Sequence, residues 1–425
     1  MNILHLNSHV NSNNLSFPHY QFHKLLLENG HNSTLVVTEG NVNELEIKIL
    51  KKKKLHPYLS LGIITRKLLF EILPRNKHIH YYPEWNVNFI NERNIIDKLD
   101  NQPDLIIAYW TKYSFNQKMI YRLSKRFNAP VLLVLYDMAH LTGGCHYSFG
   151  CDKYKHQCGK CPALNSNIDI DISRITWKYK KKYIDKTNAY LLAGSASLLA
   201  QANESSLYKG KKIYTMLGSV DEEIFKPRDK KSVRKEMGLD EKKKIIFFGA
   251  VHLDEPRKGV KYLIDALNIL KERIEGDPLR DEIHLLIAGN KLENVKLPFN
   301  HSYVGYLKTQ ELLAQAYQSA DVFVCPSVED AGPMMINLSI VAGTPVVSFD
   351  MGVATDLVHN DYTGYKARLN DSQDLANGLY KKLTMNEKEW NIMSSNCRQL
   401  GMELCSKSKQ YERLIEIIND IIYKN

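Results

Sequence analysis

One stretch of the chain predicts its fold most directly: VFVCPSVEDAGPMMINLSIVAGTPVV, residues 322–347. Its first and last segments are apolar and rich in β-branched residues, which is typical of strands that are covered on both faces of a sheet. Between them, a Gly-Pro pair opens a helix that runs from Met334 to Ala342 and ends at Gly343. The stretch therefore predicts a strand, a helix and a second parallel strand, the repeating unit of a doubly wound α/β sheet.

The start of this helix is a candidate anion site. A helix that begins at the carboxyl end of a parallel strand directs free N–H groups and a partial positive charge at the edge of the sheet. Glu329 and Asp330 precede the helix at the same strand end. We expect a phosphate-bearing ligand here, and the alternative is an ordinary strand–helix–strand unit that binds nothing.

Length and charge narrow the class of protein. A chain of 425 residues with 44% hydrophobic content predicts two or three domains with packed cores. Its 57 Lys and Arg against 47 Asp and Glu give a net charge of +10, which suits an anionic partner such as a membrane surface or a nucleotide. No zinc-finger, RNA-binding or helix-turn-helix signature is present, so we expect no nucleic acid. The absence of a long apolar run or a charged leader predicts a cytoplasmic protein.

Buried strands alternate with helices along most of the chain. Apolar, β-branched runs predict further strands at 3–6, 34–37, 104–110, 131–135, 189–193, 245–250, 283–288 and 303–306. Helical spacing of apolar residues predicts helices at 17–29, 114–127, 195–201, 260–273 and 409–423. The lysine-rich residues 226–244 are interpreted as a hinge, and a second doubly wound domain is predicted to start at Ile245.

Two basic segments suggest an anionic surface as partner. Residues 43–75 are rich in lysine and leucine and include Lys51 to Lys54, and a second basic run spans Lys178 to Lys182. Such segments can lie on an anionic bilayer, to which each Lys or Arg adds about 1 kcal/mol. The alternative is a solvated cationic helix face beside an ordinary core helix.

Four of the seven cysteines fall within 17 residues, at Cys145, Cys151, Cys158 and Cys161. Clustered thiols that end in Cys-x-x-Cys suit a tetrahedral structural Zn²⁺ site in a reducing compartment. The loop is rich in Gly, Lys and His, so a metal would order a segment that lacks an apolar core of its own. The alternative is four reduced or redox-sensitive thiols.

Residues 326–347 resemble the signature of the retaining GT-B glycosyltransferases of the large family 4, also called glycosyl transferases group 1. That pattern is Pro-Ser-x-x-Glu, a short glycine loop, a second glutamate and then Ala-x-x-x-Gly-Thr-Pro-Val-Val. When the two ends of the pattern are aligned, Asp330 takes the first acidic position. Leu338 takes the second position, whose glutamate holds the donor's ribose in the family.

Two further passages carry the resemblance. YDMAHLTGGCHY, residues 136–147, is similar to a His-Asp-x-x-x-x-Thr-Gly-Gly-Cys-x-Tyr segment of the capsule and lipopolysaccharide branch, with Tyr136 in place of the histidine over the donor sugar. RKG, residues 257–259, is similar to the end of a Gly-Arg, loop, Lys-Gly pattern that clamps the donor diphosphate. Ala250 stands in the place of that pattern's arginine, and we interpret Arg257 as its substitute.

The resemblance implies a set of site residues, and it implies that catalysis requires no cofactor. The catalytic candidates are Tyr136, Asp137 and Asp330. The donor-binding candidates are Gly249, Arg257, Lys258, Gly332, Met334, Met335 and Leu338.

The resemblance also implies the architecture: α/β, GT-B, with two Rossmann-like doubly wound domains facing a cleft. An acceptor-side domain is expected at residues 1–225, with a cysteine-rich loop at 140–165. A nucleotide-sugar-binding domain is expected at 226–405, and a C-terminal helix at 406–425 is expected to return to the first domain.

The implied function is transfer of a sugar, with retention of anomeric configuration, from a UDP- or GDP-sugar to a lipid-linked or surface glycan in polysaccharide biosynthesis. Such a protein would work in the cytoplasm, peripherally on the inner face of the plasma membrane. The alternative is a degenerate GT-B subunit that binds glycan or a partner transferase without catalysing transfer. It rests on the departures from the pattern at Tyr136, Ala250 and Leu338 and in the loop at residues 11–17, which lacks the family's Gly-Gly pair.

Overall fold

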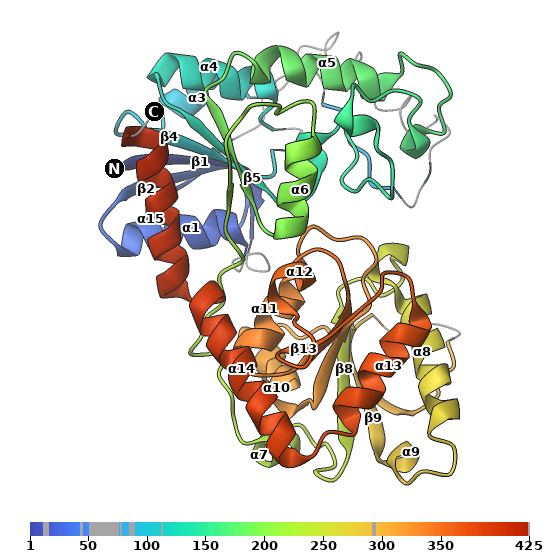
Figure 1. Ribbon diagram of the computed structural model, residues 1–425. Helices are drawn as coiled ribbons and strands as arrows, with labels where there is room; N and C mark the ends of the chain where they lie inside the picture. Colours follow the sequence, from blue (N-terminus) through green and yellow to red (C-terminus); the bar gives the residue numbers. More distant parts are fainter. Residues whose placement is uncertain are drawn as a thin grey trace. The chain divides into compact units, whose positions relative to one another are not determined.

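The computed structural model describes residues 1–11, 17–42, 46–50, 76, 79–84, 90–111, 114–290 and 295–423. The chain divides into two compact units. Unit 1 comprises residues 1–194, 198–216 and 411–425, and unit 2 comprises residues 195–197 and 217–410. Each unit is built around one parallel sheet (Figure 1). The predicted α/β class with two Rossmann-like domains is confirmed.

Unit 1 contains a seven-stranded sheet in the order β3-β2-β1-β4-β5-β6-β7. The strands are β1 Asn2–Val10, β2 Asn32–Gly40, β3 Ile47–Ile49, β4 Leu105–Ala108, β5 Val131–Leu135, β6 Ala189–Ala193 and β7 Ile213–Thr215. The helices are α1 Pro18–Glu28, α3 Glu92–Ile96, α4 Gln117–Phe127, α5 Ile172–Ile184, α6 Ala196–Glu204 and α15 Lys407–Tyr423. The strand order reverses between β1 and β4, the kind of position where open α/β sheets bind ligands at their carboxyl edge.

The C-terminal helix α15 belongs to the core of unit 1. Its residues Leu414, Ile417 and Ile418 are buried in one apolar cluster with Ile3 of β1 and Leu105 of β4. Their spacing of three and four positions places them on one face of the helix. The helix therefore packs against the sheet of the first unit, as expected, and Figure 1 shows it in red alongside these strands.

Unit 2 contains a six-stranded sheet in the order β10-β9-β8-β11-β12-β13. The strands are β8 Lys244–Ala250, β9 Ile283–Gly289, β10 Asn300–Gly305, β11 Val322–Cys325, β12 Val346–Phe349 and β13 Gly364–Ala367. The helices are α7 Lys230–Glu236, α8 Val260–Arg273, α9 Leu279–Glu282, α10 Gln310–Ser319, α11 Met334–Val341, α12 Ala354–Leu357, α13 Ser372–Leu383 and α14 Glu387–Cys405.

Successive side chains of the strands in unit 2 point to opposite faces and form two cores. Phe247 of β8 and Phe323 of β11 pack with α10, α11 and α14 on one face. Ile246 of β8 and Val324 of β11 pack with α8 and α13 on the other. Burial on both faces explains why these strands read as continuous apolar runs in the sequence.

One expectation is wrong, one holds for only part of its residues, and one lies outside the described residues. Residues 226–244 are not a hinge, because they contain α7, whose Arg234 is buried against unit 2. In the second basic run Lys178 and Lys182 are exposed. Lys180 of that run is not on the surface: it is 4% exposed and donates to the carbonyl oxygens of Ala139 and Thr142. The run Lys51 to Lys54 lies outside the described residues.

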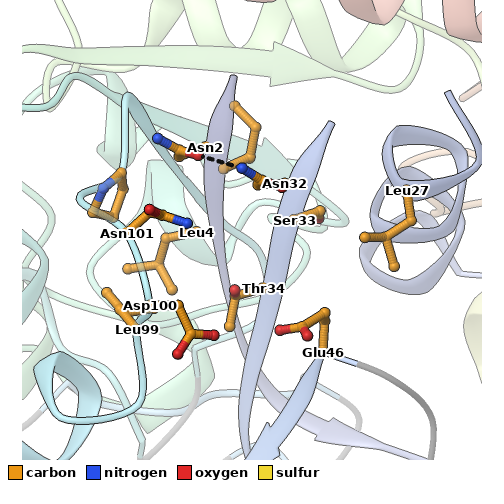
Figure 2. A pocket seen from close by; sticks show the side chains of 12 residues that line it. Asn2, Leu4, Leu27, Asn32, Ser33, Thr34, Glu46, Leu99, Asp100 and Asn101 are labelled. Atoms are coloured by element: carbon orange, nitrogen blue, oxygen red, sulfur yellow. Dashed lines mark hydrogen bonds between the residues drawn. The ribbon is translucent and has the colours of Figure 1, made fainter. Parts of the chain in front are cut away.

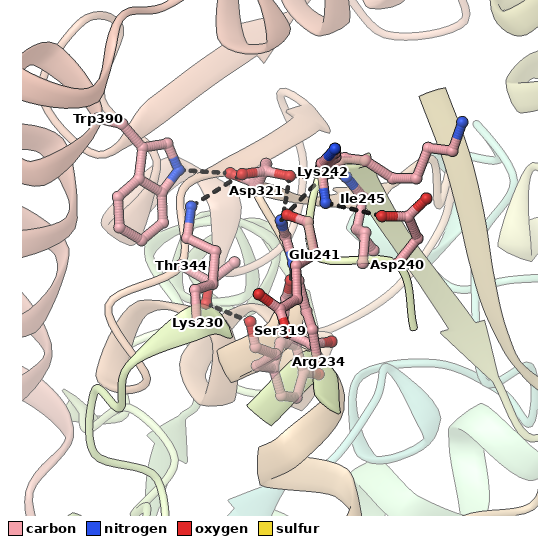
Figure 3. A network of polar contacts seen from close by, with 12 residues as sticks. Lys230, Arg234, Asp240, Glu241, Lys242, Ile245, Ser319, Asp321, Thr344 and Trp390 are labelled. Carbon is pink, nitrogen blue, oxygen red and sulfur yellow. Dashed lines mark hydrogen bonds and ion pairs between the residues drawn. The ribbon is translucent and has the colours of Figure 1, made fainter. Parts of the chain in front are cut away.

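Asp321, directly before β11, joins several elements of unit 2 (Figure 3). One of its oxygens, Oδ2, accepts hydrogen bonds from Arg234 Nη2 and from the Ile245 amide, both at 2.6 Å. Its Oδ1 accepts from Lys230 Nζ at 2.8 Å. Lys230 lies 3.3 Å from the ring centre of Trp390, whose indole N–H donates to the Asp321 carbonyl. Burial raises the pKa of Asp321, but Lys230 and Arg234 outweigh it and hold the pKa below its usual value.

We predict that Asp321→Asn lowers the free energy of unfolding of unit 2 by about 3–5 kcal/mol, because Arg234 is left buried without its carboxylate. Asp265→Asn, at an exposed position on α8, is the matched control and should change it by less than about 0.5 kcal/mol. Urea unfolding followed by tryptophan fluorescence measures both. Equal midpoints for the two variants would contradict the role assigned to Asp321.

Candidate functional site

The candidate site lies in unit 2, at the carboxyl ends of β8 and β11. The chain leaves β8 through a polar loop to the short helix η4 (Pro256–Lys258), and it leaves β11 toward α11. Because β8 and β11 are neighbours in the sheet, their following loops meet at one edge. The Val328 amide donates to the Arg257 carbonyl at 2.8 Å and ties the two loops together.

Three predicted site residues meet at this edge. Lys258 Nζ lies 2.6 Å and Arg257 Nη1 lies 2.9 Å from the same oxygen, Oδ2, of Asp330. Arg257 Nη2 also lies 2.7 Å from Glu255 Oε2. Burial raises the pKa of Asp330, but the charges of Lys258 and Arg257 outweigh it and keep the pKa below its usual value. Asp330 is therefore an ionised acceptor at neutral pH.

This arrangement suits a ligand that carries both anionic oxygens and hydroxyl groups. The guanidinium of Arg257 and the ammonium of Lys258 are donors for phosphate oxygens, and the carboxylate of Asp330 is an acceptor for hydroxyls. The helix α11 begins at Met334, four positions after Asp330, and its N-terminus favours negative charge. A nucleotide linked to a sugar has both kinds of group.

Gly259 permits the close approach of the two loops. Its φ of +68° lies in the left-handed region, and a Cβ at this position would lie 1.8 Å from the Pro326 carbonyl oxygen. Only glycine avoids both the backbone strain and this overlap. The residue therefore fixes where Arg257 and Lys258 lie relative to the end of β11.

The other predicted donor residues lie around the same strand ends. Gly249 is near the end of β8, where an added Cβ would lie 3.1 Å from the Ala288 Cβ. Met335 accepts a hydrogen bond from Tyr317 through its sulfur at 3.0 Å. Met334 and Leu338, both half-buried, also pack against the core of unit 2.

The Gly332 amide lies 3.4 Å from Asp330 Oδ1, and Gly332 itself is exposed. The Gly332 amide therefore donates to Asp330 at the start of α11. Leu338 offers no hydrogen-bonding group at the position where the family pattern has a glutamate.

Tyr136 and Asp137 lie in unit 1, directly after β5. The Tyr136 hydroxyl accepts from the His19 amide at 2.9 Å, and its burial raises the Tyr136 pKa far above the usual value, which excludes it as a base near neutral pH. Asp137 Oδ2 lies 2.6 Å from His146 Nδ1, and Asp137 Oδ1 accepts from the Ala139 amide. Asp137 is thus a half-buried carboxylate held by a histidine.

Sequence reasoning missed three partners of the predicted residues. His146 pairs with Asp137 and lies inside the quoted Thr-Gly-Gly-Cys-His motif, so a signal for it exists in the sequence. Glu255 precedes Arg257 by two positions, so its closeness in the sequence is also a signal for it. His19 contacts Tyr136 across 117 positions of sequence, and no local pattern marks it.

A pocket of about 140 Å³ in unit 1 lies at the amino-terminal ends of β1 and β2 (Figure 2). Asn2 and Asn32, the first residues of β1 and β2, line it, and Asn32 Nδ2 donates to Asn2 Oδ1 at 2.9 Å. Glu46 and Asp100 also line it. Because ligands of open α/β sheets bind at the carboxyl ends of the strands, this pocket is not the candidate site.

Residues 229–399 match the model of the family described as Glycosyl transferases group 1. Unit 2 therefore contains a domain of this family, whose members are glycosyltransferase enzymes. A relative in Escherichia coli, UDP-Gal:alpha-D-GlcNAc-diphosphoundecaprenol alpha-1,3-galactosyltransferase, is 27% identical over 218 residues. That match covers 50% of this chain and 55% of the relative, so the chain spans about half the length of that protein.

Solved structures share the fold of the whole chain. Sucrose-phosphate synthase from Thermosynechococcus elongatus superimposes with a TM-score of 0.67 at 14% identity, covering 100% of both chains. Anabaena HepE in complex with UDP and glucose gives a TM-score of 0.62 at 14% identity, covering 99% of this chain and 100% of that one. At these identities the likeness shows the GT-B fold.

Among the residues that the structure describes, no group of three or more His, Cys, Asp or Glu side chains is arranged to hold a metal ion. No helix within the same residues is long and apolar enough to cross a membrane.

We predict that Gly259→Ala lowers the free energy of unfolding by about 3 kcal/mol or more, the sum of left-handed strain and overlap with Pro326. Gly238→Ala is the matched control, because its φ is +66° and nothing lies within 4 Å of the added Cβ. It should cost only the strain, about 1–2 kcal/mol. Urea unfolding of both variants measures the difference, and similar losses would mean that the contact with Pro326 does not constrain the loop.

Proposed function

We propose that this protein is a glycosyltransferase that moves a sugar from a nucleotide-sugar donor to a glycan or lipid-linked acceptor. The observation that carries the proposal is the meeting of Arg257, Lys258 and Asp330 at the carboxyl ends of β8 and β11. Donors for a diphosphate and an acceptor for sugar hydroxyls then lie beside one helix N-terminus. Unit 2 is the nucleotide-sugar-binding domain in this proposal, and unit 1 is the acceptor-side domain.

The same groups account for catalysis by charge stabilisation. As the bond from the sugar to the diphosphate breaks, negative charge grows on the leaving phosphate oxygens. Lys258, Arg257 and the N-terminus of α11 offset that charge from fixed positions, which lowers the barrier without a metal ion or cofactor. Asp330 orients the sugar by accepting hydrogen bonds from its hydroxyls.

We further propose that the anomeric configuration is retained. The raised pKa of Tyr136 leaves it unable to take a proton near neutral pH. In this proposal the acceptor proton goes to the donor's own phosphate, as the resemblance to the retaining enzymes implies. Asp137, which follows Tyr136 and is held by His146, stays ionised. The contact with His146 outweighs the effect of burial and keeps the Asp137 pKa below its usual value. This assignment gives Tyr136 the role of a hydrogen-bonding group and Asp137 that of an orienting carboxylate.

The relatives support UDP and a lipid-linked acceptor over other choices. The name of the Escherichia coli relative specifies UDP-Gal as donor and a diphosphoundecaprenol-linked sugar as acceptor, and HepE binds UDP and glucose. We therefore propose a UDP-sugar, with a GDP-sugar as the second choice. An acceptor on a lipid carrier would place the protein on the inner, anionic face of the plasma membrane, in the synthesis of a capsule or lipopolysaccharide.

A degenerate subunit that only binds glycan or a partner transferase is the competing function. The departures from the family pattern at Leu338, Tyr136 and Ala250 support this alternative. The relatives support transfer. The test is hydrolysis of UDP-, GDP- and dTDP-sugars by the purified protein. We expect release of UDP from a UDP-sugar. A protein that neither hydrolyses nor binds any of these donors would overturn the proposal.

We predict that UDP raises the melting temperature of the protein, and that the double variant Arg257→Ala, Lys258→Ala loses this shift. At a concentration 100 times the dissociation constant, UDP stabilises the wild type by about 2.7 kcal/mol. Each variant is compared with and without UDP, so its own loss of stability cancels. Lys261→Ala, an exposed lysine in the first turn of α8, is the control and should keep the shift. A full shift in the double variant would show that these cations do not hold the nucleotide.

We also predict that Leu338→Glu tightens nucleotide-sugar binding. A carboxylate at this position accepts hydrogen bonds from the ribose, which contributes roughly 1.5–3 kcal/mol, or about one to two decades in affinity. The exposed Leu312→Glu on α10 is the control and should leave affinity unchanged. Calorimetry with UDP-sugars measures both. If Leu338→Glu instead loses stability and shows no binding, the half-buried position meets no ribose and the degenerate function is favoured.

A further inference from the structure

The four clustered cysteines of unit 1 line one pocket. The Cys145, Cys151, Cys158 and Cys161 side chains surround about 20 Å³ of space, which is room for one water-sized particle. The seven cysteines of the chain all lie in the described residues, and none forms a disulfide. Four thiols separated by up to 16 positions are therefore gathered around a space the size of a single ion.

The Cys-x-x-Cys turn is held in an unusual backbone conformation. Cys158, Gly159 and Lys160 have φ of +56°, +96° and +42°, three consecutive residues in the left-handed region. Such conformations cost about 1–3 kcal/mol each at residues other than glycine and persist where their surroundings enforce them. The turn presents Cys158 and Cys161 to the same pocket.

Contacts with the start of α5 enforce this turn. The Arg174 guanidinium donates to the Cys158 carbonyl at 3.0 and 3.2 Å, and the Gly159 amide donates to Ser173 Oγ at 2.9 Å. The Cys161 amide donates to Asp171, the N-cap residue of α5. The backbone of the two cysteines is therefore held by contacts with the first residues of helix α5.

A second segment closes the pocket around Cys145. The Gly143 amide donates to Cys158 Sγ at 3.2 Å, and the Tyr81 hydroxyl donates to the Gly143 carbonyl at 3.0 Å. Tyr81 is 2% exposed and pairs with Cys145 through a backbone bridge. A backbone amide that donates to a cysteine sulfur stabilises negative charge on that sulfur, as bound thiolates require.

We propose that this pocket binds one structural Zn²⁺ through Cys145, Cys151, Cys158 and Cys161. A thiolate ligand set selects a soft or borderline ion, and four sulfurs without an open position define a closed, structural site. Among the described residues no three ligand side chains are already arranged for a metal, so binding requires the cysteine side chains to rotate about their single torsion. The proposal concerns unit 1 alone and stands independently of the function assigned to unit 2.

The side chains that line the pocket distinguish zinc from Ca²⁺ and Mg²⁺. Among the described residues that line it, Lys153 is a cation and none is a carboxylate, which excludes the oxygen ligands that Ca²⁺ and Mg²⁺ need. Zinc with four thiolates carries a net charge of −2. Lys153 in the lining and the buried Lys180, which donates to the Thr142 carbonyl, supply opposite charge.

The test is the metal content of the full-length protein purified without chelator. Elemental analysis should give about one zinc per chain, and growth with cobalt should give a tetrahedral thiolate–cobalt spectrum. The variant Cys158→Ser, Cys161→Ser should lose the metal. The variant Cys325→Ser, Cys397→Ser, which changes two buried cysteines of unit 2, should keep it.

The wild-type protein alone can overturn the proposal, whatever the folding of the variants. A folded wild type that holds no zinc and gives no thiolate–cobalt bands would leave four reduced thiols. Iron with acid-labile sulfide in place of zinc would make the pocket a cluster site and would equally contradict the assignment. Full zinc in the Cys158→Ser, Cys161→Ser variant would place the metal elsewhere.

Discussion

The contact of Lys258 and Arg257 with one oxygen of Asp330 is the constraint on which the candidate site depends. It exists because β8 and β11 are adjacent in the sheet, so the loops after them emerge side by side. Gly259 lets those loops touch at Pro326, and the Val328 amide locks them together. A residue with a side chain at Gly259 would separate the two cations from the start of α11. The geometry of the site thus follows from strand order plus one glycine.

The charge of this site differs from that of the whole chain. The protein carries a net charge of +10, yet Arg257 and Lys258 are balanced by Glu255 and Asp330. Two cations near the N-terminus of α11 would be unfavourable alone, since the helix end is itself partly positive. The carboxylates offset that cost without a ligand. In the proposed function, an incoming diphosphate would compete with Asp330 for the cations, and the displaced carboxylate would become available to hydroxyl groups.

The sequence was sufficient for the central strands, but it missed the edge strands β3, β7 and β13 and the pairings between side chains. The apolar run from Val131 to Leu135 is a strand with the same bounds in the structure, since strands buried on both faces leave an unmistakable pattern. A lysine run is usually solvated, so the sequence predicts a surface position for Lys180, and only the fold shows that it donates to two carbonyl oxygens. His19 reaches Tyr136 across the sheet, a contact that depends on strand order and has no local signal.

The cysteine pocket and the Asp137–His146 pair share one short segment of unit 1. Cys145 and His146 are adjacent, and the Met138 amide donates to the His146 carbonyl at 2.9 Å. Thr142 accepts from the Gly144 amide and donates to the Cys145 carbonyl, which fixes the turn between them. A metal that draws Cys145 toward the pocket also fixes the backbone that carries His146. A zinc ion bound as we propose would therefore act indirectly on the end of β5, because the loop that it orders also positions His146, which holds Asp137.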